Sequence, residues 1–404
     1  MKNINKVFSL LLLTMVFLVS NSLAQTLVSG KVEDAESGLP LAYATVNVDG
    51  KESTVTNSEG MFTLKANKGS KLMVSFMGYQ AIEISDLSTD QPLVVKLKAI
   101  QINLDEVKIT SNPAKSLMDS AFKKAYLNAG KRHYAKAFIR QLSSLNDNYT
   151  GISESFFDAQ YSNFAILGWN PTQTRSSKSE KNISLSNFNF ISFASVGYLS
   201  TSVFATPLAK NASEIYNFKV QGYIKDGEDD IAIIECSIKD KKSQPTIMYF
   251  EGRYFINTDS YNVSKITGFV RNFKLNSGGP VKLEIEDSPM EAIYTKSDND
   301  SQYILKYANL NVNAKIKYAG LLGGGKLRYT SQVFILAEQA DLSKINYNGL
   351  NAASKDVDIL KEVTYDPNFW KDNPVIKRTP LEDKIIEDFE KKKMIGNYFN
   401  KNTP

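Results

Sequence analysis

The sequence predicts a mainly β protein, in which a small β-sandwich is followed by a large antiparallel β-sheet or half-barrel domain with one packed helix and a C-terminal helix. Apolar and polar residues alternate in short runs through most of the 404 residues, as expected for strands with one buried face. Turn residues separate the runs, and Asp226-Gly227 between two alternating runs is a strong hairpin signal. Only the segments 113–127 and 380–393 show clear helical spacing.

Residues 1–24 have the pattern of a secretory signal peptide. Lys2 and Lys6 supply the positive end, residues 7–19 are apolar, and Ser22-Leu23-Ala24 places small residues before a cleavage site, with Gln25 as the first mature residue. A membrane anchor is the alternative, but this apolar stretch is shorter than the roughly 20 residues that a span needs. The sequence therefore predicts an exported chain with no transmembrane span after signal cleavage.

The mild net charge and the single cysteine exclude further classes of protein. The formal charge is +5 and falls to +3 when Lys2 and Lys6 leave with the signal, which is too little to predict nucleic-acid binding. Cys236 is the one cysteine, so an internal disulfide is excluded. It lies in an alternating run that predicts a buried strand position.

Residues 26–108 are predicted to form the first domain. Within 26–98, about seven short alternating runs are separated by turn residues every 8–12 residues or so, which is typical of a small β-sandwich. Four motifs follow one another here: Gly30-Lys31-Val32, then Gly38-Leu39-Pro40-Leu41-Ala42-Tyr43-Ala44-Thr45-Val46, then Thr56-Asn57-Ser58-Glu59-Gly60-Met61-Phe62, then Val74-Ser75-Phe76-Met77-Gly78-Tyr79.

In this order the four motifs resemble the carboxypeptidase-regulatory-like domain. The resemblance implies a transthyretin-like sandwich that serves as an accessory, non-catalytic module, common at the N-terminus of bacterial outer-membrane and surface proteins. It implies no peptidase activity. The segment Leu104-Asp105-Glu106-Val107 is similar to one that precedes the energy-coupling box of outer-membrane receptors, but no plug or barrel follows it here. We interpret it as a last strand and linker.

A helix is predicted at the start of the second domain, which spans 112–340. Asn112 and Pro113 form a start signal, and Asn128-Ala129-Gly130 forms a stop signal. The apolar residues between them fall on one helical face: Leu117, Met118, Ala121, Phe122 and Ala125. A single amphipathic helix beside a long sheet most simply packs against that sheet.

About ten strands are predicted over 135–337, which suggests a large curved sheet or a partly open barrel. The expected strands are 135–141, 151–161, 214–224, 231–238, 246–250, 254–256 and 263–270, followed by alternating runs that begin at Val281, Leu310 and Leu327. Residues 249–266 resemble a hairpin of lipoprotein-carrier-like half-barrels, through a G-x-x-x-I-N-x-x-x-Y-x-V pattern from Gly252 to Val263. The same stretch resembles envelope proteins of unknown function that carry the regulatory-like domain.

Residues 163–213 fit no strand pattern well. They contain Trp169-Asn170-Pro171, a polar run and an aromatic, Ser-rich stretch, which predict a long insertion loop with helical or irregular pieces. Residues 341–404 are expected to be a tail with a helix at 380–393, which Thr379, Pro380 and Glu382 start as a capping box. The Lys391-Lys392-Lys393 run is interpreted as the solvated end of this helix, with a membrane-surface patch as the alternative.

No residue is assigned to catalysis, to a cofactor or to a metal. His133 is the one histidine, which excludes zinc sites with two histidines, and no nucleophile motif lies beside it. The glycine-rich segment 320–326 lacks the Ser or Thr of a phosphate-binding loop and precedes a strand. The acidic groups at 226–230 and 298–300 are interpreted as turns, with calcium binding as the alternative.

The sequence therefore predicts a non-catalytic exported protein of the cell envelope, in the periplasm, at the outer membrane or on the cell surface. It is expected to bind an outer-membrane or periplasmic protein partner, or an apolar ligand such as a lipid, in an apolar concavity between the helix 113–127 and the large sheet. One alternative is a glycan-binding surface protein with exposed aromatic residues near Trp169. The other is a hydrolase with two carboxylates facing one cleft.

Overall fold

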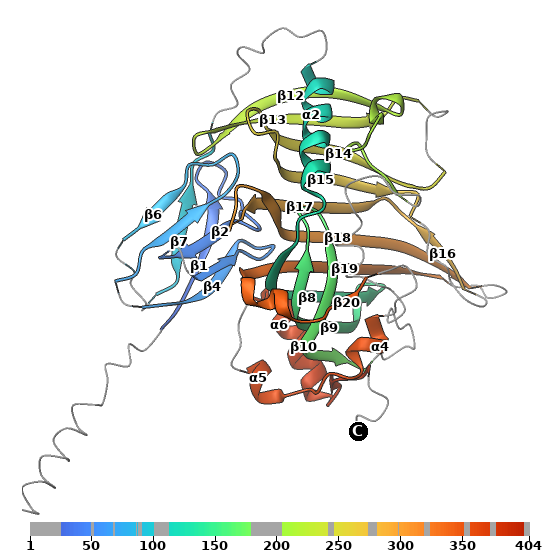
Figure 1. Cartoon of the computed structure of the whole chain (residues 1–404). Helices are drawn as coiled ribbons and strands as arrows, with labels where there is room; N and C mark the ends of the chain where they lie inside the picture. The colour runs from blue at the N-terminus through green and yellow to red at the C-terminus, as the bar shows by residue number, and fades with distance from the viewer. Residues whose placement is uncertain are drawn as a thin grey trace, which may run out of the picture. The chain divides into compact units, whose positions relative to one another are not determined.

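The computed structural model describes residues 26–49, 52–67, 69–85, 87, 91–100, 113–178, 204–240, 246–273, 281–297, 299–318, 324–350, 356–371 and 377–399. The predicted signal peptide and the 104–109 segment lie outside these residues. The chain divides into two compact units, of which the first comprises residues 1–75, 81–97 and 374–377 and the second comprises the remainder. Each unit is described by itself (Figure 1).

The described residues of the first unit form seven strands in two sheets. One sheet has the order β4 (Met61–Ala66), β1 (Thr26–Asp34) and β7 (Leu93–Leu97). The other has the order β3 (Glu52–Val55), β2 (Thr45–Val48), β5 (Leu72–Ser75) and β6 (Ile82–Ile84). All pairs are antiparallel except β1 with β7. The predicted small sandwich of about seven strands is confirmed.

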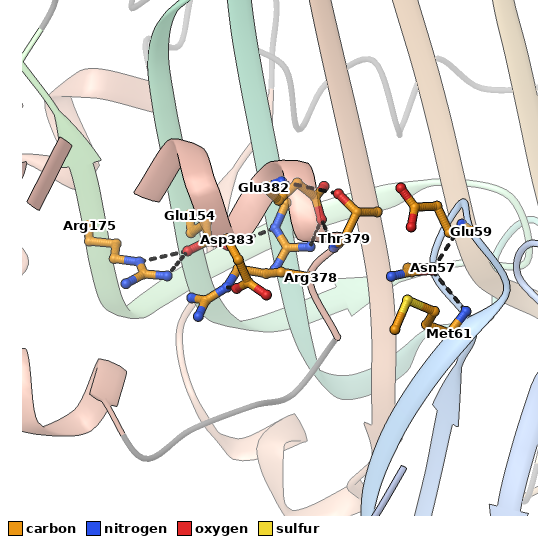
Figure 2. Close-up of polar contacts among 10 residues, drawn as sticks. Asn57, Glu59, Met61, Glu154, Arg175, Arg378, Thr379, Glu382 and Asp383 are labelled. Carbon is orange, nitrogen blue, oxygen red and sulfur yellow. Dashed lines mark hydrogen bonds and ion pairs between the residues drawn. The ribbon is translucent and has the colours of Figure 1, made fainter. Parts of the chain in front are cut away.

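The Thr56–Phe62 motif of this unit has a structural explanation. The Thr56 hydroxyl accepts a hydrogen bond from the Ala44 amide and donates one to the Leu41 carbonyl. The Asn57 side chain accepts from the amides of Glu59 and Met61, which fixes the turn (Figure 2). Gly60 has φ +74°, and a Cβ there would lie 2.5 Å from the Val32 carbonyl oxygen, so that only glycine fits.

In the second unit, the described residues form one large sheet with 14 strands. Its path is β12 (Tyr216–Asp226), β13 (Asp229–Ile238), β14 (Met248–Asn257), β15 (Val263–Arg271), β17 (Ser288–Lys296), β18 (Tyr303–Tyr318), β19 (Gly324–Glu338), β8 (His133–Leu145), β9 (Asn148–Tyr161), β10 (Ile166–Ser177) and β20 (Asn348–Gly349). Three short strands lie off this path: β11 (Phe204–Ala205) on β14, β16 (Val281–Ile285) on β18 and β21 (Ile395–Gly396) on β10. The path is antiparallel and open, which confirms the predicted large sheet.

Both predicted helices are present. They are α2 (Pro113–Asn128) and α6 (Pro380–Lys391). The short helices α4 (Asp356–Leu360) and α5 (Pro367–Lys371) and the 3₁₀ turns η1 (Ala212–Glu214) and η2 (Ala340–Lys344) were not expected from the sequence. Among the described residues, no helix has the length and apolar character that would let it cross a membrane.

Two expectations about the second unit were wrong. Part of the predicted insertion loop is the strand β10, in which Pro171 occupies the point where the register with β9 shifts, a position that tolerates a residue without an amide hydrogen. The expected strands 246–250 and 254–256 are one strand, β14, continuous through Gly252. A Cβ at Gly268 on β15 would lie 2.1 Å from the Glu251 carbonyl oxygen, so that these strands approach too closely for a side chain there. Residues 179–203 lie outside the described residues.

Candidate functional site

The helix α2 lies against one apolar face of the large sheet, and Figure 1 shows it running across the strands. Its buried positions are mostly small: Ala114, Met118, Ala121 and Ala125. They belong to one continuous apolar cluster with buried side chains from β13, β14, β15, β17, β18, β19, β8, β9 and β10. The predicted packing of the 113–127 helix on the sheet is therefore confirmed.

The sheet curves around this helix. α2 packs against β12 at one end of the strand path. The Ala125 carbonyl accepts a hydrogen bond from the Asn163 side chain, which follows β9 near the other end. A helix of 16 residues is about 24 Å long, whereas the eight steps between β12 and β9 would span about 38 Å in a flat sheet. One helix makes both contacts, as expected where a sheet curves around it.

Large aromatic side chains fill the space on this face. Trp169 is completely buried and meets Phe157 edge-on, with ring centroids 5.8 Å apart. Phe164 meets Tyr294 in the same manner at 5.0 Å. The expectation of an exposed aromatic platform at Trp169 was therefore wrong, because β10 directs this indole into the core. Trp169 was expected to be exposed because the strand β10 was not predicted.

The rim of the apolar cluster carries partly exposed hydrophobic side chains. On α2 these are Leu117 and Phe122, and on β12 they are Phe218, Val220 and Tyr223. Water reaches part of each of these side chains, whereas the alanines beneath α2 are buried. An apolar molecule that entered beside α2 would meet these rim residues first. Chemically, this region can bind apolar groups, and the described residues give it no obvious reacting group.

The opposite face of β8, β9 and β10 carries a buried group of four charges. Glu154 on β9 is 1% exposed and lies between Arg140 on β8 and Arg175 on β10. Arg140 Nε donates to one oxygen of Glu154 at 2.7 Å, and Arg175 Nε donates to the other at 2.6 Å (Figure 2). Burial alone would raise the pKa of Glu154. The positive charges and hydrogen bonds of Arg175 and Arg140 outweigh this effect and lower the pKa to about 2.

The C-terminal helix completes this group. Arg140 also contacts Glu382 at 3.3 Å, and the same Glu382 oxygen accepts from the Thr379 amide at 2.7 Å. The Thr379 hydroxyl accepts in return from the Glu382 amide, so that the predicted capping box is confirmed. Ile385, Ile386 and Phe389 of α6 pack on Ile152 of β9.

An aromatic contact from α5 closes the same face. The Arg175 guanidinium lies 4.5 Å from the Trp370 ring centroid, and Phe156 of β9 contacts the rings of both Phe369 and Trp370. Both oxygens of Glu154 are therefore occupied beneath a covered surface. A carboxylate with this pKa and these partners is a poor proton donor, which argues against acid–base chemistry here.

The other chemically interesting residues lie apart from one another. His133 begins β8 and is buried, its ring centroid 5.7 Å from that of Tyr161, and its Nε2 has no hydrogen-bond partner among the described residues. Cys236 is completely buried on β13, and burial raises the pKa of its thiol well above the usual value. The burial of Cys236 agrees with its predicted buried strand position, and His133 is buried as well.

The acidic hairpin at 226–230 is a turn, as expected. Asp226 and Asp229 pair across it, and the Tyr303 hydroxyl donates to Asp229 at 3.3 Å. Burial and the neighbouring Asp229 raise the pKa of Asp226. Over the part of the chain that the structure describes, no three His, Cys, Asp or Glu side chains come together as a metal site. Asp298, in the second acidic group, lies outside that part.

Comparison with solved structures gives only weak likenesses. A LolA superfamily protein from Nitrosomonas europaea is 11% identical with a TM-score of 0.21, over 58% of this chain and 97% of that one. A DUF1329 family protein from Desulfovibrio piger is 10% identical with a TM-score of 0.23, over 56% and 94%. A putative membrane-associated protein of unknown function from Bacteroides fragilis is 9% identical with a TM-score of 0.16, over 78% and 99%. Scores this low support no functional argument.

The first unit matches a known family. No curated protein matches the chain. The family model described as CarboxypepD_reg-like domain matches residues 28–109. These residues contain the four motifs and the seven strands described above. Residues 28–109 therefore match the CarboxypepD_reg-like domain family.

Proposed function

We propose that this chain is a non-catalytic, exported binding protein of the cell envelope, which holds an apolar ligand, or an apolar segment of an envelope protein, between α2 and the large sheet. The observation that carries the proposal is the continuous apolar cluster between one helix and a sheet that curves around it. Such a surface can accept an apolar molecule without any chemical reaction.

The side chains beneath α2 support this proposal. Three of its four buried residues are alanines, and a buried methyl contributes far less than the 1.5–3 kcal/mol or so of a buried Leu or Phe. The helix is therefore held less tightly than a leucine-rich helix of the same length. Displacing it from the sheet costs correspondingly little, and the apolar ligand offsets that cost by covering the same surface.

The two units then have different roles. The CarboxypepD_reg-like domain is the accessory module, and the large sheet is the binding domain. The predicted signal at 1–24 would deliver both to the periplasm or the outer membrane. The glycan-binding alternative has lost its expected site at Trp169, and the hydrolase alternative finds its most buried carboxylate, Glu154, held by two arginines.

Native mass spectrometry of the mature chain, purified from its own envelope fraction, tests this proposal. A bound lipid-sized mass that organic extraction removes is the expected result. The variant Ala121→Leu, which fills space under α2, should reduce the bound fraction, whereas Ser116→Leu on the exposed side of the same helix should not. A wild-type chain with no bound mass would refute apolar ligand binding. Thermal unfolding of both variants shows that each is folded.

A further inference from the structure

The C-terminal end of α2 presents two adjacent apolar side chains to solvent. Leu127 is 78% exposed and Tyr126 is 67% exposed, which makes them the two most exposed large apolar side chains among the described residues. The Tyr126 ring contacts Phe122 one turn earlier, with centroids 5.8 Å apart. Single exposed apolar residues are ordinary, but an exposed pair backed by a third ring is a patch that requires an explanation.

This patch lies on the outward face of the helix. The buried residues Ala121 and Ala125 are on the side of α2 that contacts the sheet. Lys123 is three and four residues before Tyr126 and Leu127, so that all three share the opposite face. Side chains exposed by two-thirds or more protrude from a surface and do not line a groove. The patch therefore suits a flat partner into which side chains can insert.

The charge around the patch has one sign. Lys123, Lys124, Lys131 and Arg132 surround it, and residues 120–132 contain no acid. None of these four cations has an ion pair with any residue that the structure describes, although Arg132 donates to backbone carbonyls just beyond the helix. The nearest acid in sequence, Asp119, is paired with Lys115 at 2.6 Å. The four cations near the C-terminal end of α2 are therefore not neutralised by a neighbouring acid in the sequence, and this end of the helix is positive.

The lysine run at the end of α6 shows the contrast. Lys391 lies 3.6 Å from Glu387, and Asp388 and Glu390 are in the same two turns. Leu381, the exposed apolar residue of that helix, is at its other end. Positive charge and exposed apolar side chains coincide at the end of α2 and not at the end of α6.

We infer that the C-terminal end of α2 is a membrane-contact site, at which Tyr126 and Leu127 insert among the headgroups of an anionic lipid surface while Lys123, Lys124, Lys131 and Arg132 contact its negative charge. Aromatic and leucine side chains flanked by cations are the usual composition of an interfacial anchor. Each cation near an anionic surface strengthens binding by about fivefold. This site lies on the outside of α2, whereas the proposed ligand lies beneath the helix, and Phe122 borders both.

Vesicle flotation of the mature chain tests the inference. With phosphatidylglycerol–phosphatidylethanolamine vesicles, the chain should float at low salt, and it should float much less with pure phosphatidylcholine vesicles. Lys123→Ser should lower the partition coefficient by about fivefold, and the double variant Tyr126→Ser/Leu127→Ser should lower it by more than tenfold. Leu39→Ser is the matched control, because Leu39 is 65% exposed in the first unit, and it should float as the wild type does.

Three results would overturn the inference: equal binding to neutral vesicles, unchanged binding of the double variant, or no binding. A photo-crosslinker at position 127 in intact cells that captures one protein in place of lipid, together with no flotation, would assign the patch to an acidic protein partner instead. All the substituted side chains are solvent-exposed, so the variants should unfold at the wild-type temperature. The bound mass in native mass spectrometry is read separately, so that failure of one proposal is distinguishable from failure of the other.

Discussion

Replacing Glu154 with Gln tests the account of the buried charge group most directly. The change keeps the shape of the side chain and removes the charge between Arg140 and Arg175, both of which are buried. Removing one partner of a buried ion pair typically costs about 3–5 kcal/mol, because the remaining charge stays buried. The pKa gives a similar figure: lowering it from 4.5 to about 2 corresponds to about 3 kcal/mol of stabilisation. The expected loss of unfolding free energy is therefore about 3 kcal/mol or more.

The same group predicts a dependence on pH. Because the pKa of Glu154 is lower in the folded chain than in the unfolded chain, its contribution is fully present above the unfolded value near 4.5. It is lost progressively as the pH falls from there towards 2. The wild type should therefore lose stability across this window more steeply than Glu154→Gln, which has no carboxyl group to protonate at this position.

Urea unfolding, followed by tryptophan fluorescence at pH 7 and at pH 3, measures both effects. Trp370 is a useful reporter because its ring contacts Arg175. Glu235→Gln on β13 is the control: Glu235 pairs with Arg253 at 3.1 Å, and both side chains are exposed, by 37% and 58%. Its cost should stay below about 1 kcal/mol. Equal losses for the two variants would refute the claim that burial gives the Glu154 group its strength.

Three further predictions concern other parts of the second unit. Thr379→Ala removes the cap of α6 and should lower the free energy of unfolding by about 1 kcal/mol. Limited proteolysis near this helix should become about fivefold faster. Unchanged cleavage would show that the cap does not hold the helix. Gly268→Ala places a Cβ against the Glu251 carbonyl and should cost about 1–3 kcal/mol in thermal unfolding, a result that an unchanged midpoint would contradict. The Cys236 thiol, buried and with a raised pKa, should resist iodoacetamide in the native chain and react in urea; fast native alkylation would argue against its burial.

Local patterns allowed much of the fold to be predicted. The turn and alternation signals located β12 and β13 because the Asp226-Gly227 hairpin is a short-range feature. The Thr379 capping box located the start of α6 for the same reason. The strand β10 was missed because Pro171 and its polar neighbours break the alternation, and only the shifted register with β9 accommodates them.

The candidate sites depend on residues that are distant in the sequence. Arg140, Glu154, Arg175 and Glu382 come together only once the strand order is known. No local signal marked this group, because β8 also carries Lys136, β9 also carries Asp158, and Ser and Gln residues interrupt the apolar pattern of both strands. The exposure of Tyr126 and Leu127 was equally hidden, because the helical pattern places apolar residues around much of α2 and only packing decides which of them are covered.

The strand order has a consequence for how this chain acquires its structure. The pairing of β8 with β19 joins Arg140 to Gln332, and Arg140 reaches Glu382, 242 residues later in the chain. Contacts this far apart give a high contact order, which slows folding because long loops must close before any pairing stabilises them. During synthesis, one edge of β8 can pair with β9 at once, but its other edge has to wait for β19. A chain that emerges from the ribosome with one edge of β8 still unpaired stays incompletely folded for longer, and an incompletely folded chain is the form that is easily threaded through a narrow pore.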